Sequence, residues 1–559
     1  MIVTVLAILI GLLYYFVIYP LFLSPLSSLP GPKHLKLTSL FILNKSRKEQ
    51  RNEYLQKLHE KYGDVVQIGP NEVAFNSFEH MKRIYMGNFP KEFDNNGVGF
   101  YSQFGNFNER NLFSTGDSKA HIEKKRNVSK VYSKSSVIQS GGYIKAKIDK
   151  AWDAIDRNLG KSMNVYSLFL SLAMDVVSGF EYGSKYSTNF LTEIDHTTAS
   201  IEGKSSNEDV FLGFRESSSM WFYTTLAPSL WSPVAKWYGI GAKMGKAQQW
   251  IYHRFQEALT SLQQGSSLSD DQLQSPVSTM ISSMFEEFTK EPNGTSKSLL
   301  RYEQIASEIA DHVVAGHETT GTTLTYICWE LSRPCNRQWQ DKLFEECQQS
   351  TGDIQKLDQL PVLHSVIQEA CRLHSAIPGS EPRYVPRSQE GSKFEVTLND
   401  STKTKVEIPP GTVVSCQPWS LHLLQTPFGS NPRQFDPSRW LRDQASGETE
   451  EEYETRLKTM NNSIFTFGQG NRMCLGMNLA LIEMKYCIAT LYSKYTTSIC
   501  PKWCANVCQQ NKDVLMGRRG SATSTYPSTD LDLMRMADTY TTSPMMGQCW
   551  LRFESRDAH

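Results

Sequence analysis

An uninterrupted apolar run at the N-terminus limits the chain to folds that can sit at a membrane. Residues Ile2 to Leu23 include no charged side chain, and a helix rising about 1.5 Å per residue would span about 33 Å over this stretch. A cleavable signal peptide is the alternative, but it would need a positive n-region and a small-residue cleavage site. Because the first charges follow the run, starting at Lys33, the positive-inside rule favours an uncleaved anchor with the downstream chain in the cytosol.

Four prolines, one near the end of this run and three after it, stiffen the chain, since proline fixes its own φ and restricts the preceding residue. They are Pro20, Pro25, Pro30 and Pro32. We therefore predict a transmembrane anchor at 2–23, a proline-rich hinge at 24–48 and a single large domain at 49–559.

Composition excludes several classes of protein. The 58 Lys and Arg residues balance 58 Asp and Glu residues, which argues against nucleic-acid binding. The 11 cysteines all lie between Cys328 and Cys549, and an odd number clustered in this way is a poor disulfide framework. Cys500, Cys504 and Cys508 lack the paired spacing of a zinc site, so we interpret them as ordinary thiols in a reducing compartment.

Local patterns predict a mainly α fold with small β-sheets. Residues 49–62 read as a helix, and 65–68 and 72–75 as short strands around a Gly-Pro-Asn turn. From about Lys119 to Leu343 the periodicity is mostly helical. Further strands are predicted at 394–398, 406–408 and 550–553.

The most informative stretch is Phe467-Gly-Gln-Gly-Asn-Arg-Met-Cys-Leu-Gly476, which precedes an apolar helical run. Its glycines permit a tight loop with positive φ, and Cys474 is presented where a helix begins. A thiolate there gains from the free N–H groups and dipole of the helix N-terminus. The alternative is a glycine-rich loop with a buried cysteine.

This stretch resembles the F-x-x-G-x-R-x-C-x-G pattern of the cytochrome P-450 superfamily. The resemblance implies that Cys474 is the axial ligand of the iron of heme b. It also implies that the Cys474 thiolate favours O–O cleavage. It also implies that Phe467, Gly468 and Gly476 shape the cofactor loop.

A second motif, Ala315-Gly316-His317-Glu318-Thr319-Thr320, lies inside the proline-free run from Tyr302 to Leu331. It resembles the family's A-G-x-[DE]-T-[TS] element on the helix over the distal haem face. Ala315 and Gly316 would then adjoin the haem, Gly316 leaving room for dioxygen and substrate. Thr319 and Glu318 would deliver protons for oxygen activation. The alternative is a solvated helix face, and we interpret His317 as structural.

A third motif pairs Glu369 with Arg372 on one helix face. Alone it is weak, but residues 435–440 follow it and resemble the family's F-x-P-x-R-W segment. The resemblance implies that Glu369, Arg372 and Arg439 form a structural charge network behind the haem. Because buried charges need full pairing, substituting any of them should reduce haem retention first.

Cationic side chains are expected at the two haem propionates. Arg472 and Arg383 match the family's arginines, whereas the usual W-x-x-x-R element is replaced by His121-Ile-Glu-Lys-Lys125. His121 and Lys125 can still donate to carboxylates, although lysine loses bidentate geometry. The basic stretch through Arg126, Lys130 and Lys134 is either solvated or the docking surface for an acidic reductase.

The substrate region is aromatic, with seven Phe or Tyr residues between Phe89 and Phe113. Such side chains either line an apolar pocket or belong to the core. The amino-acid sequences of several motifs resemble those of filamentous-fungal enzymes that oxidise terpenoids, alkaloids or polyketides. The polar stretch 511–529 fits poorly and is predicted to be either an insertion or unspliced intron.

Three functions remain open at this stage. The first is a monooxygenase of the endoplasmic reticulum membrane, using O2 and electrons from NADPH-cytochrome reductase, with cytochrome b5 as a further donor. The second uses the same haem for desaturation, coupling or rearrangement without oxygen insertion. The third is a non-catalytic haem sensor, which intact Glu318 and Thr319 disfavour because a sensor needs no proton relay.

Overall fold

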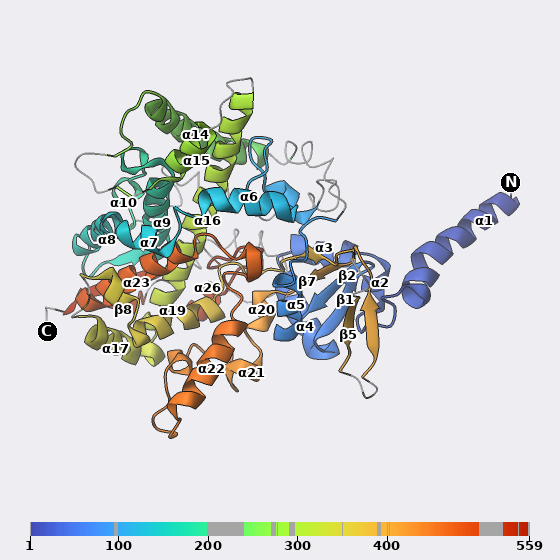
Figure 1. Ribbon diagram of the computed structural model, residues 1–559. Coiled ribbons are helices and arrows are strands. Elements are labelled where there is room, and N and C mark those ends of the chain that lie inside the picture. The colour runs from blue at the N-terminus through green and yellow to red at the C-terminus, as the bar shows by residue number, and fades with distance from the viewer. Residues whose placement is uncertain are drawn as a thin grey trace.

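The computed structural model describes residues 2–556 except 94–98, 198–236, 238–239, 270–274, 277, 290–296, 349, 351, 388–392, 400, 402, 502, 504–528 and 546. A helical body joins a smaller lobe that contains most of the β structure (Figure 1). This confirms the prediction of a mainly α fold with small sheets. The polar stretch predicted at 511–529 lies outside the described residues, apart from Thr529.

The apolar run forms one continuous helical rod, α1 (Ile2–Leu13) followed by the π-helical η1 (Tyr14–Leu23). Neither segment contains a buried residue, and the rod projects away from the body (Figure 1). Among the described residues it is the one helix long and apolar enough to cross a bilayer. Its length and exposure are consistent with membrane anchoring.

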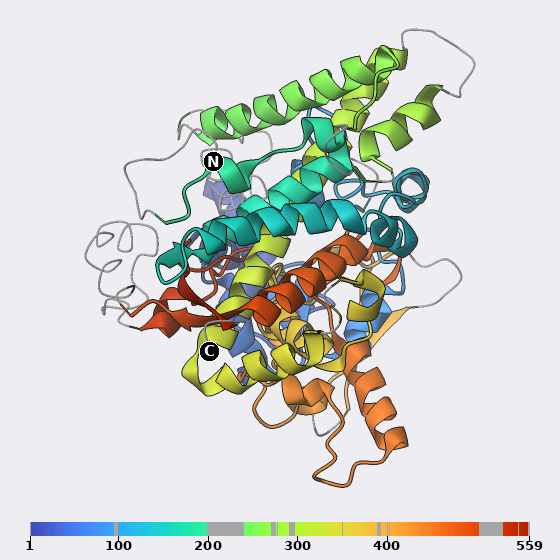
Figure 2. The ribbon, with the colours of Figure 1, turned by 90° about the vertical axis from the view of Figure 1, so that its left-hand side faces the viewer.

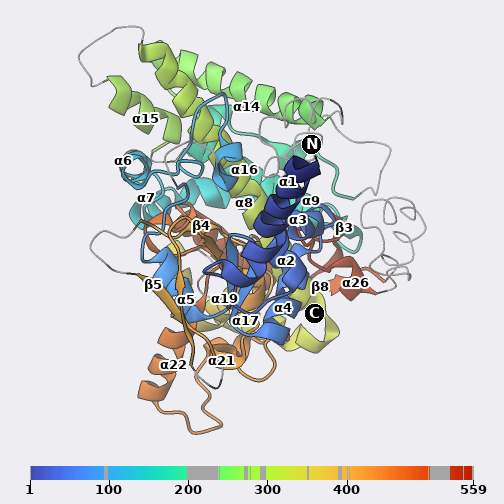
Figure 3. The ribbon, with the colours of Figure 1, turned by 90° about the vertical axis from the view of Figure 1, so that its right-hand side faces the viewer.

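The segment predicted as a hinge contains two short helices, α2 (Lys33–Leu37) and α3 (Leu40–Arg47). It is fixed to the sheet lobe, because Gln67 N donates to Pro30 O at 2.8 Å and Leu35 is fully buried. The Lys36 ammonium also donates to Ser27 O and Leu29 O at 2.8 and 2.6 Å. The rod therefore joins the lobe through a segment that hydrogen bonds and burial hold in place (Figure 3).

The lobe is built on a four-stranded sheet in the order β1 (Val65–Gly69), β2 (Glu72–Phe75), β7 (Val413–Ser415), β4 (Arg383–Tyr384). β1 and β2 are antiparallel with Val66 opposite Ala74, β2 and β7 are parallel, and β4 pairs antiparallel with β7. The β5 (Phe394–Thr397) and β6 (Lys405–Ile408) hairpin adjoins it, with α4 (Arg51–Tyr62) and α5 (Phe78–Tyr85). The strands expected at 65–68, 72–75, 394–398 and 406–408 and the helix expected at 49–62 are all present.

The rest of the body is mostly helix, and the long α16 (Lys297–Ser332) crosses its middle (Figure 2). Its helices are α6 (Ser118–Val128), α7 (Lys134–Gln139), α8 (Gly141–Asp156), α9 (Val165–Tyr182), α10 (Phe190–Glu193), α14 (Ile240–Gln263), α15 (Met280–Thr289), α16 (Lys297–Ser332), α17 (Arg337–Cys347), α18 (Ile354–Leu357), α19 (Pro361–Leu373), α20 (Pro418–Leu421), α21 (Gln425–Phe428), α22 (Glu450–Ser463), α23 (Met477–Lys494) and α26 (Asp530–Leu533). Short 3₁₀ turns are η2 (Phe100–Phe104), η3 (Ser184–Tyr186), η5 (Pro334–Asn336), η6 (Pro437–Trp440) and η7 (Gly470–Arg472). A separate three-stranded sheet has the order β3 (Ser162–Asn164), β9 (Trp550–Ser555), β8 (Tyr495–Ile499). The last strand of the chain, β9, is its central strand.

Helices α9 and α16 pack closely because glycines of α16 face α9. A Cβ added at Gly316 would lie 2.6 Å from Val177 Cγ2, and one at Gly321 would lie 2.9 Å from Leu170 Cα. Both distances are shorter than van der Waals contact. The small residues of the Ala315–Thr320 motif region therefore set how closely α16 approaches its neighbour.

We expect Gly321→Ala to destabilise the protein by about 1–3 kcal/mol, because the new methyl group meets backbone atoms of α9 that cannot rotate away. A suitable control is Gly245→Ala in α14, where nothing lies within 4 Å of the added carbon. There the higher helix propensity of alanine should stabilise the helix by up to about 1 kcal/mol. Thermal unfolding of both variants should shift in opposite directions; a loss at both sites would contradict the packing argument.

Candidate active site

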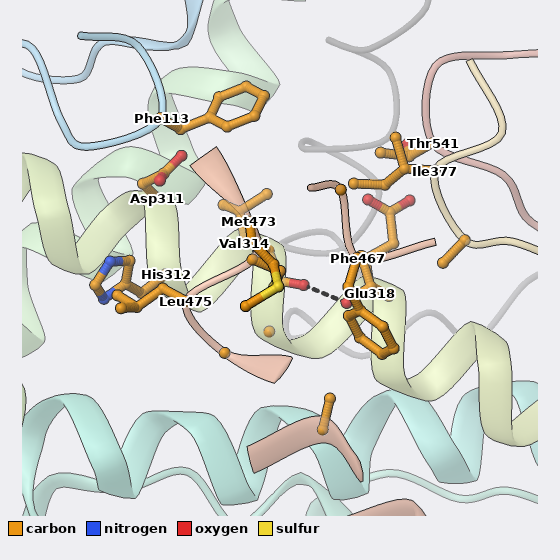
Figure 4. A pocket seen from close by; sticks show the side chains of 18 of the residues that line it. Phe113, Asp311, His312, Val314, Glu318, Ile377, Phe467, Met473, Leu475 and Thr541 are labelled. Atoms are coloured by element: carbon orange, nitrogen blue, oxygen red, sulfur yellow. Dashed lines mark hydrogen bonds between the residues drawn. The ribbon is translucent and has the colours of Figure 1, made fainter. Parts of the chain in front are cut away.

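A cavity of about 400 Å³ lies between α16 and the loop that precedes α23. Cys474 and Phe467 line one wall, and Ala315, Glu318 and Thr319 line the other. The aromatic segment that contains Phe113 and the residues Ile377 and Thr541 close the remaining sides (Figure 4). Segments far apart in the sequence thus converge on one space.

The cysteine loop is held by its own backbone. Gly468 and Gly470 adopt φ of +68° and +70°, in the left-handed region that favours glycine. A Cβ at Gly470 would lie 2.5 Å from Tyr85 O, so the loop also passes close to α5. Cys474 N donates to Phe467 O at 2.8 Å, which closes the loop immediately before α23.

The Cys474 thiol is exposed to the cavity but surrounded by protein elsewhere. Burial raises its pKa, whereas N–H groups of Gly476 and Met477 and the Lys125 ammonium lower it. These are the donors that stabilise a thiolate at a helix start. Phe467, Gly468 and Gly476 line the same cavity, so the structure brings the predicted loop residues together.

On the facing wall, Thr319 Oγ1 donates to Ala315 O at 2.7 Å, one helical turn back. The Glu318 side chain points into the cavity (Figure 4). Gly316 lines the cavity as expected, but its close contact with Val177 gives it a packing role that the sequence did not indicate. His317 is buried and bonded to Val313 O at 2.8 Å, in keeping with a structural residue.

Cationic groups gather on one side of the cavity. Arg383 is buried and donates to the Tyr101 hydroxyl, and Arg472 donates to Thr115 O and Gly116 O at 2.6 and 2.9 Å. His121 is buried, and desolvation with the nearby Arg472 lowers its pKa to about 3, so its imidazole is neutral. All three residues line the cavity.

Lys125 differs from its expected position. Its ammonium donates to Asn471 O at 2.8 Å, and it is absent from the described residues that line the cavity. Lys125 therefore braces the cysteine loop from outside.

Sequence reasoning missed Lys91, which is buried and lines the cavity. Its ammonium donates to Phe113 O at 2.7 Å and lies 3.9 Å from the Tyr101 ring centroid. Burial and then Arg383 lower the pKa of both Lys91 and Arg472, the latter to about 10. Since mutual repulsion contributes to these shifts, the cluster suits an anionic group such as two carboxylates.

Behind the cysteine loop, the structure brings together Glu369, Arg372 and Arg439. Arg372 forms two hydrogen bonds to the Glu369 carboxylate, of 2.8 and 2.7 Å, and Arg439 Nε adds a third of 3.1 Å. Trp440 Nε1 and Asp436 N also donate to Glu369, each at 3.0 Å. Arg372 further binds His422 O and Pro432 O, both at 2.7 Å. This buried carboxylate is therefore fully paired.

A helical body with a cysteine loop facing a threonine-bearing helix across a cavity is the architecture of a haem-thiolate oxidoreductase. Comparison with known proteins agrees: the sequence model of the family Cytochrome P450 matches residues 29–522. The chain belongs to the cytochrome P450 family. It is accordingly an oxidoreductase, and the family binds haem through a cysteine thiolate and uses dioxygen, a redox partner and a substrate.

Curated fungal proteins resemble nearly the whole chain. Cytochrome P450 monooxygenase hkm5 of Aspergillus hancockii is 26% identical, over 87% of this chain and 87% of its own length. Conidiogenone synthase PchP450 of Penicillium rubens is 26% identical over 86% and 89%. Pisatin demethylase of Fusarium vanettenii is 23% identical over 86% and 87%.

Proposed function

We propose that this chain is a membrane-anchored monooxygenase that binds heme b through Cys474 and oxidises an apolar small molecule. The observation that carries the proposal is the placement of Cys474 directly across one cavity from Glu318 and Thr319. Bound haem would supply the activation of dioxygen; the chain supplies the ligand, the proton path and the pocket.

The cavity fits haem on the chemistry of its walls. Cys474 offers a thiol supported by backbone donors, and Arg383, Arg472, Lys91 and the neutral His121 offer donors for two propionates. Glu381 forms an ion pair of 3.5 Å with Arg383 and offsets part of this positive charge. Lys125 would act indirectly, by holding the backbone of the cysteine loop.

Residues of α16 would deliver the protons. The Thr319 hydroxyl bonds its own helix through Ala315 O, and rotation about its side chain would turn that donor toward the cavity. Glu318 lies next to it in the chain and reaches the same space, where a carboxyl can relay protons from solvent. Together they would pass protons to the reacting oxygen.

The partners and location follow the same proposal. The rod at 2–23 would cross the endoplasmic reticulum membrane once and leave the body in the cytosol. NADPH-cytochrome reductase, with cytochrome b5 as a further donor, would dock on the basic face of α6 and the residues after it, Lys119, Arg126 and Lys130. The fungal relatives support a specialised-metabolite intermediate as substrate.

The test is turnover in membranes with reductase, NADPH and ¹⁸O2 over a panel of terpenoid, alkaloid and polyketide compounds. Oxygen insertion predicts a product that carries one labelled oxygen atom. An unlabelled product that has lost two hydrogens would instead support desaturation or coupling, and an unlabelled isomer of the substrate would support rearrangement.

For any compound that turns over, Thr319→Ala should reduce product formed per NADPH consumed by about 10²-fold, because the proton path loses its alcohol. Thr319→Ser keeps the hydroxyl and should retain most of the coupling. NADPH consumption and product are measured together. Equal coupling in the alanine variant and the wild type would exclude Thr319 from proton delivery.

A further inference from the structure

A second cavity lies outside the haem site, between the C-terminal end of α4 and the segment 423–434. This open groove has a volume of about 960 Å³, which is enough for a small organic ligand. It shares no lining residue with the cavity that contains Cys474. Its walls are mostly polar, and the function proposed above does not use it.

Several hydrogen-bond acceptors in the groove lack donors. His59 is 6% exposed, and its Nδ1 donates to Gly63 O at 2.9 Å. Burial lowers the His59 pKa to about 4, so the ring is neutral and Nε2 keeps a lone pair that can accept. Asn76 is 5% exposed. Within the described part of the chain, neither Asn76 Oδ1 nor Gln56 Oε1 has a hydrogen-bond partner.

The local fold brings these acceptors together with a carboxylate. Asp64 follows Gly63, the residue to which His59 donates, at the turn between α4 and β1. Asn76, which follows β2, donates its backbone N–H to Asp64 O at 2.8 Å. The end of α4 and the paired ends of β1 and β2 therefore present one imidazole, one amide and one carboxylate to the same groove.

Asp64 is the carboxylate in the groove that lacks a counter-charge. No cationic side chain among the residues described above pairs with it, and Asn399 Nδ2 donates to it at 3.3 Å. Glu60, in contrast, pairs with Arg433 at 3.4 Å and accepts from Gln56 Nε2 at 3.0 Å. Burial raises the Asp64 pKa, as expected where no cation offsets it. The groove therefore keeps one uncompensated negative charge.

Acceptors without donors, together with one negative charge, favour a cation that carries several N–H groups. A guanidinium offers five such donors in one plane and is more weakly hydrated than an ammonium. It would also satisfy buried acceptors that are costly to leave without a partner. A metal ion fits less well, because the described residues contain no group of three His, Cys, Asp or Glu side chains that could hold one.

We propose that this groove binds a guanidinium group, either of a free guanidino compound or of an arginine on a partner protein. Asp64 would supply the counter-charge, and His59 Nε2 and Asn76 Oδ1 would accept its N–H groups. The site is separate from the haem cavity and goes beyond the oxidation proposed above.

Occupation of the groove would also stabilise the structure behind the cysteine loop. The wall opposite α4 includes Asn431 and Pro432. Arg372 donates to Pro432 O at 2.7 Å, and Arg439 donates to Asn431 O at 2.5 Å. Both arginines also bind Glu369. A ligand that contacts this segment therefore favours the state in which the Glu369 network is formed.

The test compares butylguanidinium with its neutral isostere butylurea. Binding of each to the full-length holoenzyme in nanodiscs is measured by calorimetry, for wild type, Asp64→Asn, Asp64→Glu and Glu395→Gln. Glu395→Gln is the matched control, because it neutralises an exposed carboxylate of β5, in the same lobe, that does not line the groove.

The wild type should bind butylguanidinium at least about 10-fold more tightly than butylurea. Asp64→Asn should abolish this preference, whereas Asp64→Glu and Glu395→Gln should retain it. Circular dichroism and the carbon monoxide spectrum of each sample report the fold and the haem ligation separately. No preference in the wild type, or a preference that survives Asp64→Asn, would overturn the proposal.

A third probe, the peptide acetyl-Ala-Arg-Ala-amide, distinguishes the two sources of the guanidinium. A peptide bound at least about 10-fold more tightly than butylguanidinium identifies an arginine of a partner protein, because flanking backbone then adds to the affinity. Equal or weaker binding of the peptide identifies a free guanidino compound.

Discussion

Replacing Arg372 by methionine is expected to lower the free energy of unfolding by about 3–5 kcal/mol, because it leaves the Glu369 carboxylate buried without its main counter-charge. Glu369 is 0% exposed and Arg372 1%. The substitution also removes the donor to His422 O and Pro432 O. Since this network lies between α19 and the segment that leads to the cysteine loop, purified protein should carry less than half the haem of the wild type.

Arg333→Met provides the control, because Arg333 pairs with Glu330 at the same i,i+3 spacing and at 2.8 Å. The Arg333 side chain is 23% exposed, and Glu330 keeps a hydrogen bond from Asn336 and a contact of 2.9 Å with His374. We expect a loss of about 1 kcal/mol or less and normal haem content. Unfolding is followed by circular dichroism, and haem is measured per polypeptide. Equal losses in the two variants would contradict the role given to the buried Glu369 and Arg372 pair.

Cys474→Ser is the second substitution with a large effect. Serine keeps the size of the side chain and the backbone hydrogen bond to Phe467 O, but its hydroxyl does not ionise to a soft thiolate ligand. We therefore expect the fold to persist and substrate oxidation to become undetectable, because the thiolate that favours O–O cleavage is lost. Met473→Leu, in the same loop, should keep most of the activity. Near wild-type turnover in Cys474→Ser would remove Cys474 from the reaction.

The order of elements was predictable because it depends on local pattern, whereas the roles of the site motifs were implied by their resemblance to a known family. The helical run through Ala315–Thr320 and the pairing of Glu369 with Arg372 both need only helical spacing, and the structure shows α16 and α19 at those places. The Gly468 and Gly470 turn was likewise readable from glycine chemistry.

Features that depend on long-range packing were not predictable. Lys91 joins the cationic wall because the aromatic segment folds back on Arg383 and Arg472, and no local motif marks it. His121 and Lys125 share a helix face at i,i+4, but the cysteine loop covers Lys125 and leaves His121 on the cavity.

The absorption spectrum of the dithionite-reduced, carbon-monoxide-bound protein tests whether Cys474 ligates the haem iron. Thiolate-ligated haem should give a strongly red-shifted Soret band in the wild type, and Cys474→Ser should lose that shift. Bound haem without the shift in the wild type, or a shift that persists in Cys474→Ser, would show that Cys474 is not the ligand and would contradict the proposed haem-thiolate chemistry.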